Sequence, residues 1–358
     1  MSEAPGRRQA VRISDVARAA GVSKTLVSYA LNDRPGVKES TRAHIVETAQ
    51  AMGWTPSMRA RALSASRAYA IGLVFQTSPE ALASDQYFTS LMAGLQSVLS
   101  TSQYSLVTEV VDSAEAEAVA YRRLALDGRV DGMVIADLRA DDPRFGLVRE
   151  AGLAYVSLGR PPEQAGMPVL VYDETQAIAD VVAHLAERGH TRIAHVAGPQ
   201  VNDAAKVRRE QYQKHLRRHG LPDSAWVASD YTAGGGREAT TRLLEGDPQP
   251  TAIVYANDLM AIAGMSVIHS RGLRVPEDIS IVGWDDITVS QYLHPALSTV
   301  TQHPFDDGRL AAQLLLEAID GKEFADPVWT PNPRFVPRAS TGRVGTGQAG
   351  AGPASAGA

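Results

Sequence analysis

The sequence predicts an all-α domain at the N-terminus, followed by a larger α/β body with parallel sheets. Apolar residues follow a helical period between Ile13 and Trp54, whereas beyond residue 68 short apolar strands alternate with helices. Strands separated by helices of this length indicate parallel sheets with right-handed crossovers. Charge divides the chain at the same place, because residues 1–68 hold 11 Lys or Arg and 5 Asp or Glu, and the other 290 residues hold 24 and 35. A small basic domain on an acidic body indicates that only the first part meets a polyanion.

The composition excludes several classes of protein. The chain has 358 residues, 44% hydrophobic and 21% charged, which suits two or three domains with a sizeable core and excludes collagen and wholesale disorder. Cysteine is absent, which excludes disulfides and a thiolate metal site, and we expect neither a metal nor a cofactor. The longest stretch without a charged residue, Gln86–Thr108, is rich in Ser, Thr and Gln, unlike a membrane span. The N-terminus lacks the apolar region of a secretory signal, so we expect a cytoplasmic protein with no membrane partner.

Three short helices are predicted in the N-terminal domain, residues 12–56, after a disordered arm over residues 1–11. Ser14 is placed to cap a first helix, Ser23 a second that begins at Lys24, and Ser40 a third that ends near residue 52. Two short helices joined by a turn that contains glycine, near a basic N-terminus, are the helix-turn-helix pattern of DNA-binding proteins.

Strands and helices then alternate through the body. Strands are predicted at 70–75, 105–111, 132–136, 154–158, 169–172, 193–196, 252–255 and 279–283. Helices are predicted at 87–99, 114–126, 176–187, 206–219, 235–244, 259–270 and 305–319. The tail, residues 339–358, is largely Gly, Ala and Ser and is expected to be disordered.

The second helix of a helix-turn-helix lies in the major groove, with its first residues facing base edges. Here those residues are Lys24, Thr25 and Ser28, with Tyr29 one turn further. A lysine can contact guanine O6 and N7, and a threonine can contact a phosphate or a thymine methyl group. The alternative is a small three-helix bundle with a solvated basic face.

Four motifs in this region carry a resemblance to a known family. They are D-V-A-x-x-A-G-V-S, V-S-x-x-L-N, T-R and G-W-x-P, in this order between Asp15 and Pro56. With them the chain resembles the LacI/GalR family of transcriptional regulators, and the similarity runs to about Arg338. The resemblance implies a DNA-binding set of Ser14, Ser23, Lys24, Thr25, Ser28, Tyr29 and Asn32. The family usually has Thr-Val-Ser-Arg where this chain has Leu26-Val27-Ser28-Tyr29. The DNA half-site that a relative prefers therefore cannot be assigned to this chain.

The resemblance also implies a hinge helix over residues 57–67. In relatives this helix folds on DNA, in pairs, and inserts a leucine between base pairs in the minor groove. Leu63 stands at that position, with Ala60 one turn earlier. An apolar wedge of this kind unstacks a base step and bends the duplex. The alternative is a plain flexible linker.

For the body, residues 68–338, the resemblance implies an effector-binding and dimerisation domain. Its fold would be two α/β lobes with parallel sheets, like a periplasmic sugar-binding protein, with the ligand between the lobes. Lobe one would comprise residues 69–171 and 293–324, and lobe two residues 172–292 and 325–338. The chain would cross between the lobes three times.

Candidate effector-binding residues follow from two arguments. Ligands of open α/β sheets bind beyond the carboxyl ends of the strands, where the polar candidates are Arg160, Asp173, Arg208, Asn257, Asp285 and Gln302. Aromatic faces cover the apolar side of a pyranose, and by family position those are Phe88, Tyr231 and Trp284. Structural alternatives stay open, because Asp258 and Asp286 could cap helices, Asp173 could brace a crossover, and Phe88 could belong to the core. The segment VRREQY resembles the family motif R-x-x-G-Y, with Gln211 in place of glycine.

Together these observations predict a dimeric transcriptional regulator, and we expect it to be a repressor. Two DNA-binding domains related by a two-fold axis need a pseudo-palindromic operator, and a small effector, most simply a sugar, would set the affinity. A purine- or nucleoside-responsive co-repressed regulator is an alternative, as is a sugar-modifying enzyme with an added DNA-binding domain. No catalytic residue is expected, because the chain has neither an H-E-x-x-H nor a G-x-S-x-G motif. The tail after Pro337 lacks a leucine heptad, which favours a dimer over a tetramer.

Overall fold

The computed structural model describes residues 11–31, 35–54, 67–161 and 166–344. The chain divides into two compact units, residues 1–68 and 69–358. The predicted hinge helix, with Ala60 and Leu63, lies outside the described residues except for its last position, and Asn32 also lies outside them.

The first unit is a bundle of three helices, as the sequence predicts. They are α1 (Ile13–Ala19), α2 (Lys24–Leu31) and α3 (Glu39–Ala51). Val16, Val27 and Ile45, one from each helix, are fully buried in a common core. In α2, Val27 and Ala30 are buried in this core, whereas Lys24 and Thr25 in its first turn are exposed.

Two of the predicted caps in this unit are wrong. The first helix begins at Ile13, so Ser14 lies inside it, and Asp15 accepts a hydrogen bond of 2.9 Å from the backbone N–H of Arg12 instead. The third helix begins at Glu39, one residue before Ser40. Both helices start earlier than a serine cap would place them, because Asp15 and Glu39 provide an acidic first turn that favours the helix N-terminus.

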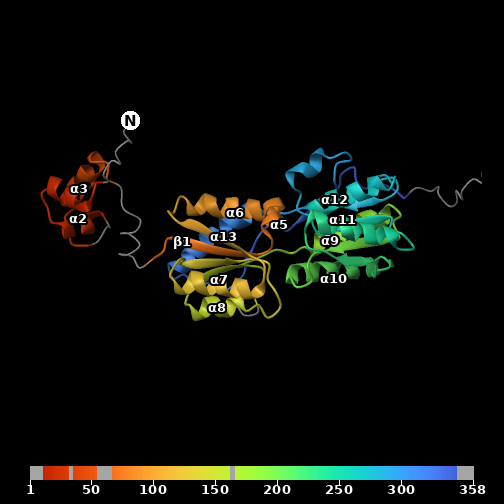
Figure 1. The fold of residues 1–358 in the computed structure, drawn as a ribbon, viewed down its shortest axis with the longest axis horizontal. Helices are drawn as coiled ribbons and strands as arrows, with labels where there is room; N and C mark the ends of the chain where they lie inside the picture. Colours follow the sequence, from red (N-terminus) through yellow and green to blue (C-terminus); the bar gives the residue numbers. More distant parts are fainter. Residues whose placement is uncertain (1–10, 32–34, 55–66, 162–165, 345–358) are drawn as a thin grey trace, which may run out of the picture. The chain divides into compact units, whose positions relative to one another are not determined.

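Lobe one of the second unit is built on a six-stranded sheet with the order β11-β5-β4-β3-β1-β2, and every pair in it is parallel. The strands are β1 (Ala70–Gln76), β2 (Ser105–Val111), β3 (Gly132–Ile135), β4 (Ala154–Leu158), β5 (Val169–Val171) and β11 (Val328–Trp329). Helices α6 (Gln86–Leu99) and α13 (Pro304–Ile319) cover one face, with the short α5 (Pro79–Ser84) beside α6 (Figure 1). Helices α7 (Ala114–Leu126) and α8 (Arg144–Glu150) cover the other face.

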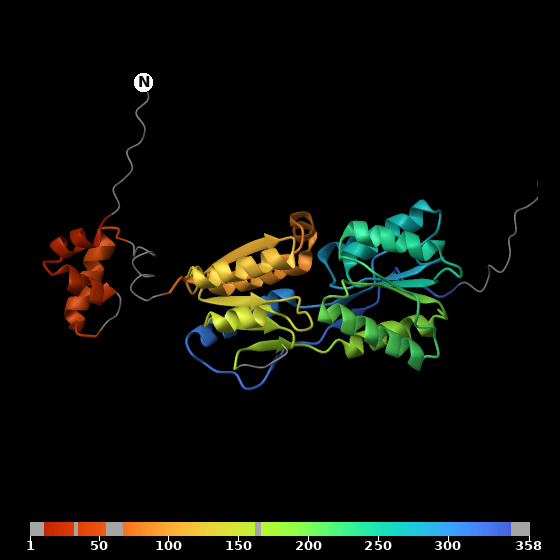
Figure 2. The same ribbon diagram turned by 60° about the horizontal axis from the view of Figure 1, so that its bottom comes forward.

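Two glycines allow the close packing of α6 against α13. A Cβ at Gly94 would lie 2.0 Å from the carbonyl oxygen of Phe305, and a Cβ at Gly308 would lie 2.2 Å from that of Leu91. The two backbones therefore touch, although about 200 residues separate the helices. This contact fixes α13, from the C-terminal part of the chain, in lobe one (Figure 2).

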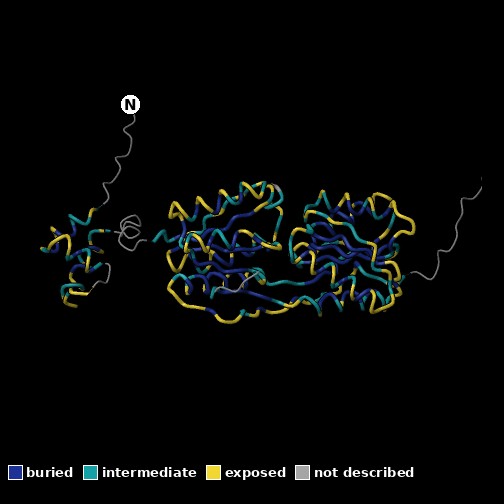
Figure 3. Tube along the Cα trace, turned by 90° about the horizontal axis from the view of Figure 1, so that it is seen from below, coloured by how far each residue is buried: buried dark blue, intermediate teal, exposed yellow. Residues whose placement is uncertain are grey.

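Lobe two is built on a four-stranded parallel sheet with the order β7-β6-β8-β9. Its strands are β6 (Ile193–Ala197), β7 (Trp226–Ala228), β8 (Ala252–Tyr255) and β9 (Ser280–Val282). Helices α9 (Thr175–Glu187) and α10 (Asp203–Arg218) cover one face, and α11 (Ala233–Glu245) and α12 (Asp258–Ser270) the other (Figure 1). A 3₁₀ turn, η1 (Thr288–Tyr292), follows β9. In both lobes the central strands are buried, the edge strands β2, β7 and β11 are partly exposed, and the outer helix faces are exposed (Figure 3).

The predicted bounds of the lobes are wrong at three places near the C-terminus. Residues 293–301 belong to lobe two, because β10 (Thr299–Thr301) pairs with β12 (Arg334–Val336) and Ser298 bridges to Val282 in β9. Residues 328–329 belong to lobe one, because β11 pairs with β5. Residues 339–344 are not a loose tail, since Ser340 is fully buried and its hydroxyl donates a hydrogen bond of 2.7 Å to the carbonyl of Ile281. Backbone pairing with distant strands fixes these short segments.

No helix among the described residues is both long enough and apolar enough to cross a membrane.

Candidate functional site

The exposed face of α2 carries the residues that the sequence places at the DNA. Lys24 and Thr25 are exposed in its first turn, and Tyr29 is 38% exposed one turn later. Val27 and Ala30 point the opposite way, into the core. The helix begins where predicted, because the Ser23 hydroxyl accepts a hydrogen bond of 3.1 Å from the backbone N–H of Leu26. Of the described DNA-binding set, Lys24, Thr25 and Tyr29 are exposed, Ser23 caps α2, and Ser28 in α2 and Ser14 in α1 are half-buried.

Arg42 holds α3 against the end of α2. Its guanidinium donates a hydrogen bond of 2.8 Å to the carbonyl of Ala30, one of the carbonyls that a helix leaves unpaired at its last turn. This arginine belongs to the T-R motif. Its structural role is to fix the position of the helix that presents Lys24.

The second unit contains a cavity of about 480 Å³ between its two lobes. That volume falls within the ~300–1,000 Å³ typical of small-molecule sites. The wall from lobe one follows the carboxyl ends of β3, β4, β5 and β11, and the wall from lobe two follows those of β8 and β9. Beyond these strand ends, the start of α10 and the turn before α11 complete the wall of lobe two. The sequence predicts this location, because ligands of open α/β sheets bind beyond the carboxyl ends of the strands.

Eight of the nine predicted effector residues line the cavity, namely Phe88, Arg160, Asp173, Arg208, Tyr231, Asn257, Asp285 and Gln302. Trp284, the ninth, does not. Its side chain is fully buried in the core of lobe two, and the Arg208 guanidinium lies over its ring at 4.0 Å from the ring centroid. Trp284 therefore supports a lining residue from behind and is not an aromatic platform for the ligand.

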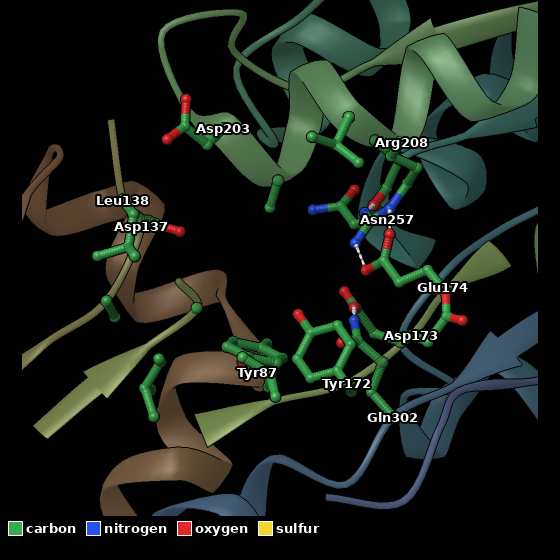
Figure 4. A pocket seen from close by; sticks show the side chains of 18 of the residues that line it. Tyr87, Asp137, Leu138, Tyr172, Asp173, Glu174, Asp203, Arg208, Asn257 and Gln302 are labelled. Atoms are coloured by element: carbon green, nitrogen blue, oxygen red, sulfur yellow. Dashed lines mark hydrogen bonds and ion pairs between the residues drawn. The ribbon is translucent and has the colours of Figure 1, made fainter. Parts of the chain in front are cut away.

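Arg208 is held in a bidentate ion pair with Glu174 (Figure 4). Its Nε lies 2.9 Å and its Nη2 2.5 Å from the two carboxylate oxygens, and its Nη1 donates to the carbonyl of Ala256 at 3.3 Å. Glu174 raises the pKa of the guanidinium above its ordinary value despite the burial that opposes this. The Arg208 guanidinium is thus already paired within the protein.

A group of carboxylates faces the cavity from both lobes. Desolvation by the surrounding protein, together with the nearby Asp85, raises the pKa of Asp137 to about 6. Burial, with Asp258 and Asp85 nearby, raises the pKa of Asp285 well above its ordinary value. Gln302 donates a hydrogen bond of 2.6 Å to Asp285, which partly offsets this rise.

Three lining residues have backbone conformations that side chains rarely adopt. The φ angles are 49° at Asp137, 65° at Tyr231 and 107° at Asp285. Such conformations cost energy and persist only where the surrounding fold imposes them, which is characteristic of binding sites.

Asn257 and Asp173 carry structural roles as well as a place in the lining. Asn257 caps α12 by accepting a hydrogen bond of 2.9 Å from the backbone N–H of Met260, and its amide donates to the carbonyl of Tyr231. Asp173 accepts from the backbone N–H of Thr175, while its own N–H donates to the Asn332 side chain on another crossover. The alternative that Asp173 braces a crossover is therefore supported.

The two other helix caps considered from the sequence are not caps. Asp258 is buried below the site, where it accepts hydrogen bonds from the hydroxyls of Ser290 and Thr299, each 2.6 Å long. Asp286 forms an ion pair of 2.6 Å with Arg338. Both carboxylates tie loops of lobe two together instead of capping the helices that follow them.

Phe88 belongs both to the core and to the cavity. Its ring packs edge-on against Phe75 in the core of lobe one, at 4.9 Å between centroids, and it also lines the cavity.

Arg160 lies over the ring of Trp329, at 5.5 Å from the centroid. Both guanidinium groups in the lining thus lie against an aromatic ring.

The two lobes meet at one rim of the cavity. The backbone N–H of Asp203, at the start of α10, donates a hydrogen bond of 2.8 Å to the carbonyl of Leu138 in lobe one. Arg139 and Asn202 form an isolated bridge beside it. This contact joins the loop after β3 to the helix that carries Arg208, so a change in lobe closure must alter it.

The lining residues that sequence reasoning missed include Glu174, Tyr87, Tyr172 and Trp329. Glu174 and Tyr172 flank Asp173 after the strand VLVY, so the strand-end rule applied to neighbouring positions would have found them. Trp329 could not be found, because β11 is only two residues long. Among the described residues there is no group of His, Cys, Asp or Glu arranged to hold a metal ion.

Comparison with known proteins agrees with both parts of the chain. Residues 12–57 match the model of bacterial regulatory proteins of the lacI family, and residues 182–341 match that of a periplasmic binding protein-like domain. The chain is 32% identical over 337 residues to the probable HTH-type transcriptional repressor ExuR of Bacillus subtilis (strain 168), covering 93% of this chain and 99% of that protein.

Solved structures are similar over the same length. The crystal structure of the lac repressor dimer bound to operator and the anti-inducer ONPF is 28% identical, with a TM-score of 0.80, and covers 93% of this chain and 100% of that chain. The complex of the transcriptional regulator CelR with cellobiose is 29% identical, with a TM-score of 0.68, and covers 92% and 99%. A helix-turn-helix domain, a two-lobed body and full-length similarity to repressors lead to one conclusion: the chain belongs to the lacI family of bacterial regulatory proteins and is a DNA-binding transcriptional regulator.

Proposed function

We propose that this chain is a repressor that binds a pseudo-palindromic operator as a dimer, with an affinity set by a small effector in the cavity between its lobes. The observation that carries the proposal is that one chain combines an exposed α2 face with a cavity at the strand ends of both lobes. The first supplies a means of reading DNA, and the second a means of sensing a metabolite.

The lining supports a hydroxyl-rich ligand, most simply a sugar. Carboxylate and amide oxygens accept hydrogen bonds from hydroxyl groups, and Asp137, Asp285 and Gln302 offer such atoms. Phe88 and Tyr231 offer aromatic surface for the apolar face of a sugar ring. The relative CelR was solved with cellobiose, which is a sugar of this kind.

Coupling between the two sites follows from linkage. A ligand that binds one state of lobe closure more tightly shifts the protein toward that state, and operator affinity changes by the same free energy. The contact between Leu138 and Asp203 at the cavity rim is a place where the two states would differ. Induction and co-repression use this linkage with opposite signs.

The proposal is tested by binding the full-length protein to a pool of DNA duplexes of random sequence, and by sequencing the duplexes that it retains. We expect an enriched site with two inverted half-sites, and a dimer on that duplex by light scattering. The affinity for the enriched duplex should change when one sugar of a tested panel is added. Enrichment of no sequence, or of a site without inverted symmetry, would contradict the proposal.

A further inference from the structure

This inference rests on the proposed function and concerns how the two lobes are held together. Helix α10 begins at the cavity without a side-chain cap. Asn202, the residue before its first turn, has an extended backbone with φ −84° and ψ 128°, and among the described residues its side chain accepts no hydrogen bond from that turn. By contrast, Asp85, Thr232 and Asn257 each cap the helix that follows them. The first backbone N–H groups of a helix have no partner within it, so those of α10 need one from elsewhere.

Lobe one supplies a partner for the first of them. The backbone N–H of Asp203, the first residue of α10, donates a hydrogen bond of 2.8 Å to the carbonyl of Leu138, in the loop after β3. Asn202 and Arg139 form an isolated antiparallel bridge beside it. Leu138 and Asp203 both line the cavity, and Figure 4 shows them at the same edge of it. A helix of lobe two is therefore capped by a backbone carbonyl of lobe one.

A buried group of charges holds the loop of Leu138 to lobe one. The Arg139 guanidinium forms an ion pair with Glu117 of α7 and donates a hydrogen bond of 2.6 Å to the side chain of Gln76, at the end of β1. The backbone N–H of Arg139 donates to the Asp142 carboxylate at 3.2 Å. Glu117 is buried, and a buried carboxylate is costly to leave unpaired, so this pair keeps Arg139 in place.

Arg144 fixes the same loop from its other end. Its guanidinium donates a hydrogen bond of 3.0 Å to the carbonyl of Asp137 and forms a buried ion pair of 2.6 Å with Asp142. Asp137 and Asp141 have φ angles of 49° and 51°, which side chains rarely adopt. The loop is thus held by lobe one on both sides of Leu138, and we expect its carbonyl to stay with lobe one when the lobes separate.

Separation of the lobes at this rim therefore breaks the bond and leaves the start of α10 uncapped. A ligand that contacts the walls of both lobes favours the closed state, in which this bond is formed. The bond and such a ligand consequently favour the same state of the protein. Arg208, a lining residue, lies on the helix that the bond caps.

We propose that the hydrogen bond from Asp203 to Leu138 is a latch between the lobes, that it sets the operator affinity of the effector-free protein, and that Arg139 positions its lobe-one half. Loss of the latch shifts the protein toward the open state. Operator affinity then moves in the direction opposite to the change that a ligand of both lobes causes.

The donor of the latch can be removed with Asp203→Pro in the full-length protein. Proline has no backbone N–H, it suits the first position of a helix, and the extended backbone of Asn202 is the one that a following proline requires. Asp203→Ala is the matched control, because it removes the same carboxylate and keeps the N–H group. We expect the operator dissociation constants of the two variants, measured by anisotropy without any compound, to differ by about fivefold, the value of one ordinary hydrogen bond. Equal constants would overturn the latch.

A disulfide can replace the latch, because the chain has no cysteine of its own. Residues paired in an antiparallel bridge have Cα atoms roughly 4.5–5.5 Å apart, which suits a disulfide. Arg139→Cys and Asn202→Cys are therefore combined with Asp203→Pro. We expect a disulfide on mild oxidation, and we expect the oxidised protein to return to the operator affinity of Asp203→Ala. The proposal fails if no disulfide forms, or if the oxidised and reduced proteins bind operator equally.

The positioning role of Arg139 is tested with Arg139→Met. We expect operator affinity to shift in the same direction as in Asp203→Pro, with no further shift in the double variant, because both changes act on one contact. Arg139→Lys keeps a cation beside Glu117 and should recover part of the shift. Arg123→Met is the control, since Arg123 pairs with Glu109 within lobe one. If Arg139→Met binds operator as Arg123→Met does, Arg139 has no positioning role.

Hydrogen exchange separates this inference from the proposed function, because it needs neither operator nor effector. Backbone amides of residues 138–142 and 204–206 should exchange faster in Asp203→Pro than in Asp203→Ala. A protein that selects no duplex yet shows this difference contradicts the proposed function and supports the latch. Equal exchange in the two variants contradicts the latch whether or not an operator is found.

Discussion

At the scale of residues, Asp258 shows how a buried charge can organise a lobe. Its carboxylate accepts hydrogen bonds from the Ser290 and Thr299 hydroxyls and from the backbone N–H of Ile287. These donors come from the loop after β9 and from β10, which follow it by about 30 to 40 residues in the chain. Asp258, at the start of α12, thus connects this helix to the loop after β9 and to β10.

The pKa of Asp258 leads to a prediction for stability. Burial raises the pKa of this carboxyl to about 6, above its ordinary value of 3.8. The folded state therefore binds the proton more tightly than the unfolded state, and its contribution to stability falls as pH rises from about 4 to about 6. We expect Asp258→Asn to reduce this slope when the free energy of unfolding in urea is measured at pH 4.5 and pH 6.5.

The Asp258→Asn variant should also be less stable than the wild type at pH 6.5, because an amide cannot accept all three hydrogen bonds. Asp278→Asn is a suitable control, since the hydrogen bond and ion pair with Arg274 lower the pKa of that carboxyl, opposite to the shift at Asp258. An unchanged pH slope in Asp258→Asn would show that the titration of Asp258 is not linked to folding.

At the scale of elements, segments with an apolar run or a helical period could be predicted from the sequence, whereas four short strands could not. The strands at 105–111, 154–158 and 252–255 and the helix at 114–126 have the predicted bounds, because a run of apolar residues or a helical period determines each locally. Strands β7, β10, β11 and β12 have two or three residues each, and distant backbone partners create them.

The candidate site divides in the same way. The positions after each strand could be predicted, since all parallel strands end at the same edge of a sheet. The partners could not: the pairing of Arg208 with Glu174 and its packing on Trp284 join segments up to about 110 residues apart. Trp284 follows β9 as Asp285 does, but its side chain points into the core, and the sequence does not indicate which neighbour turns inward.

Helix α2 leads to a prediction for DNA recognition. Lys24 is exposed in its first turn, where a helix-turn-helix protein contacts base edges. We expect Lys24→Ala to weaken binding to the selected operator by about 1–3 kcal/mol, measured by fluorescence anisotropy, and to relax the preference at one base pair. Lys214→Ala, at an exposed position of α10 in the body, is the control and should leave the affinity unchanged. An equal loss on operator and random duplexes would make Lys24 a phosphate contact only.

At the scale of the whole molecule, the C-terminal segment belongs to the body as far as residue 344. The backbone N–H of Ser340 donates to the carbonyl of Ala296, and that of Val344 donates to the carbonyl of Arg188. These bonds connect the end of the chain to lobe two. A deletion that begins at residue 340 would therefore remove part of the fold.

Deletion of residues 345–358 should behave differently from deletion of residues 340–358. We expect the shorter deletion to leave both Tm and the oligomeric state unchanged, because the removed residues contain no leucine, isoleucine or phenylalanine to form an assembly helix. The longer deletion should lower Tm by several degrees, since it removes the buried Ser340. Calorimetry and light scattering measure both effects, and a change of oligomeric state in the shorter deletion would contradict this account.

The central claim is that occupancy of the cavity controls operator affinity, and one titration tests it most directly. The operator dissociation constant of the full-length protein is measured by anisotropy at fixed salt, with and without a saturating amount of the compound that binds the cavity. The account predicts a change of roughly 5- to 150-fold in the wild type, the range of typical allosteric coupling, and a much smaller change in Asp285→Asn. An operator dissociation constant that stays the same while the cavity is saturated would contradict it.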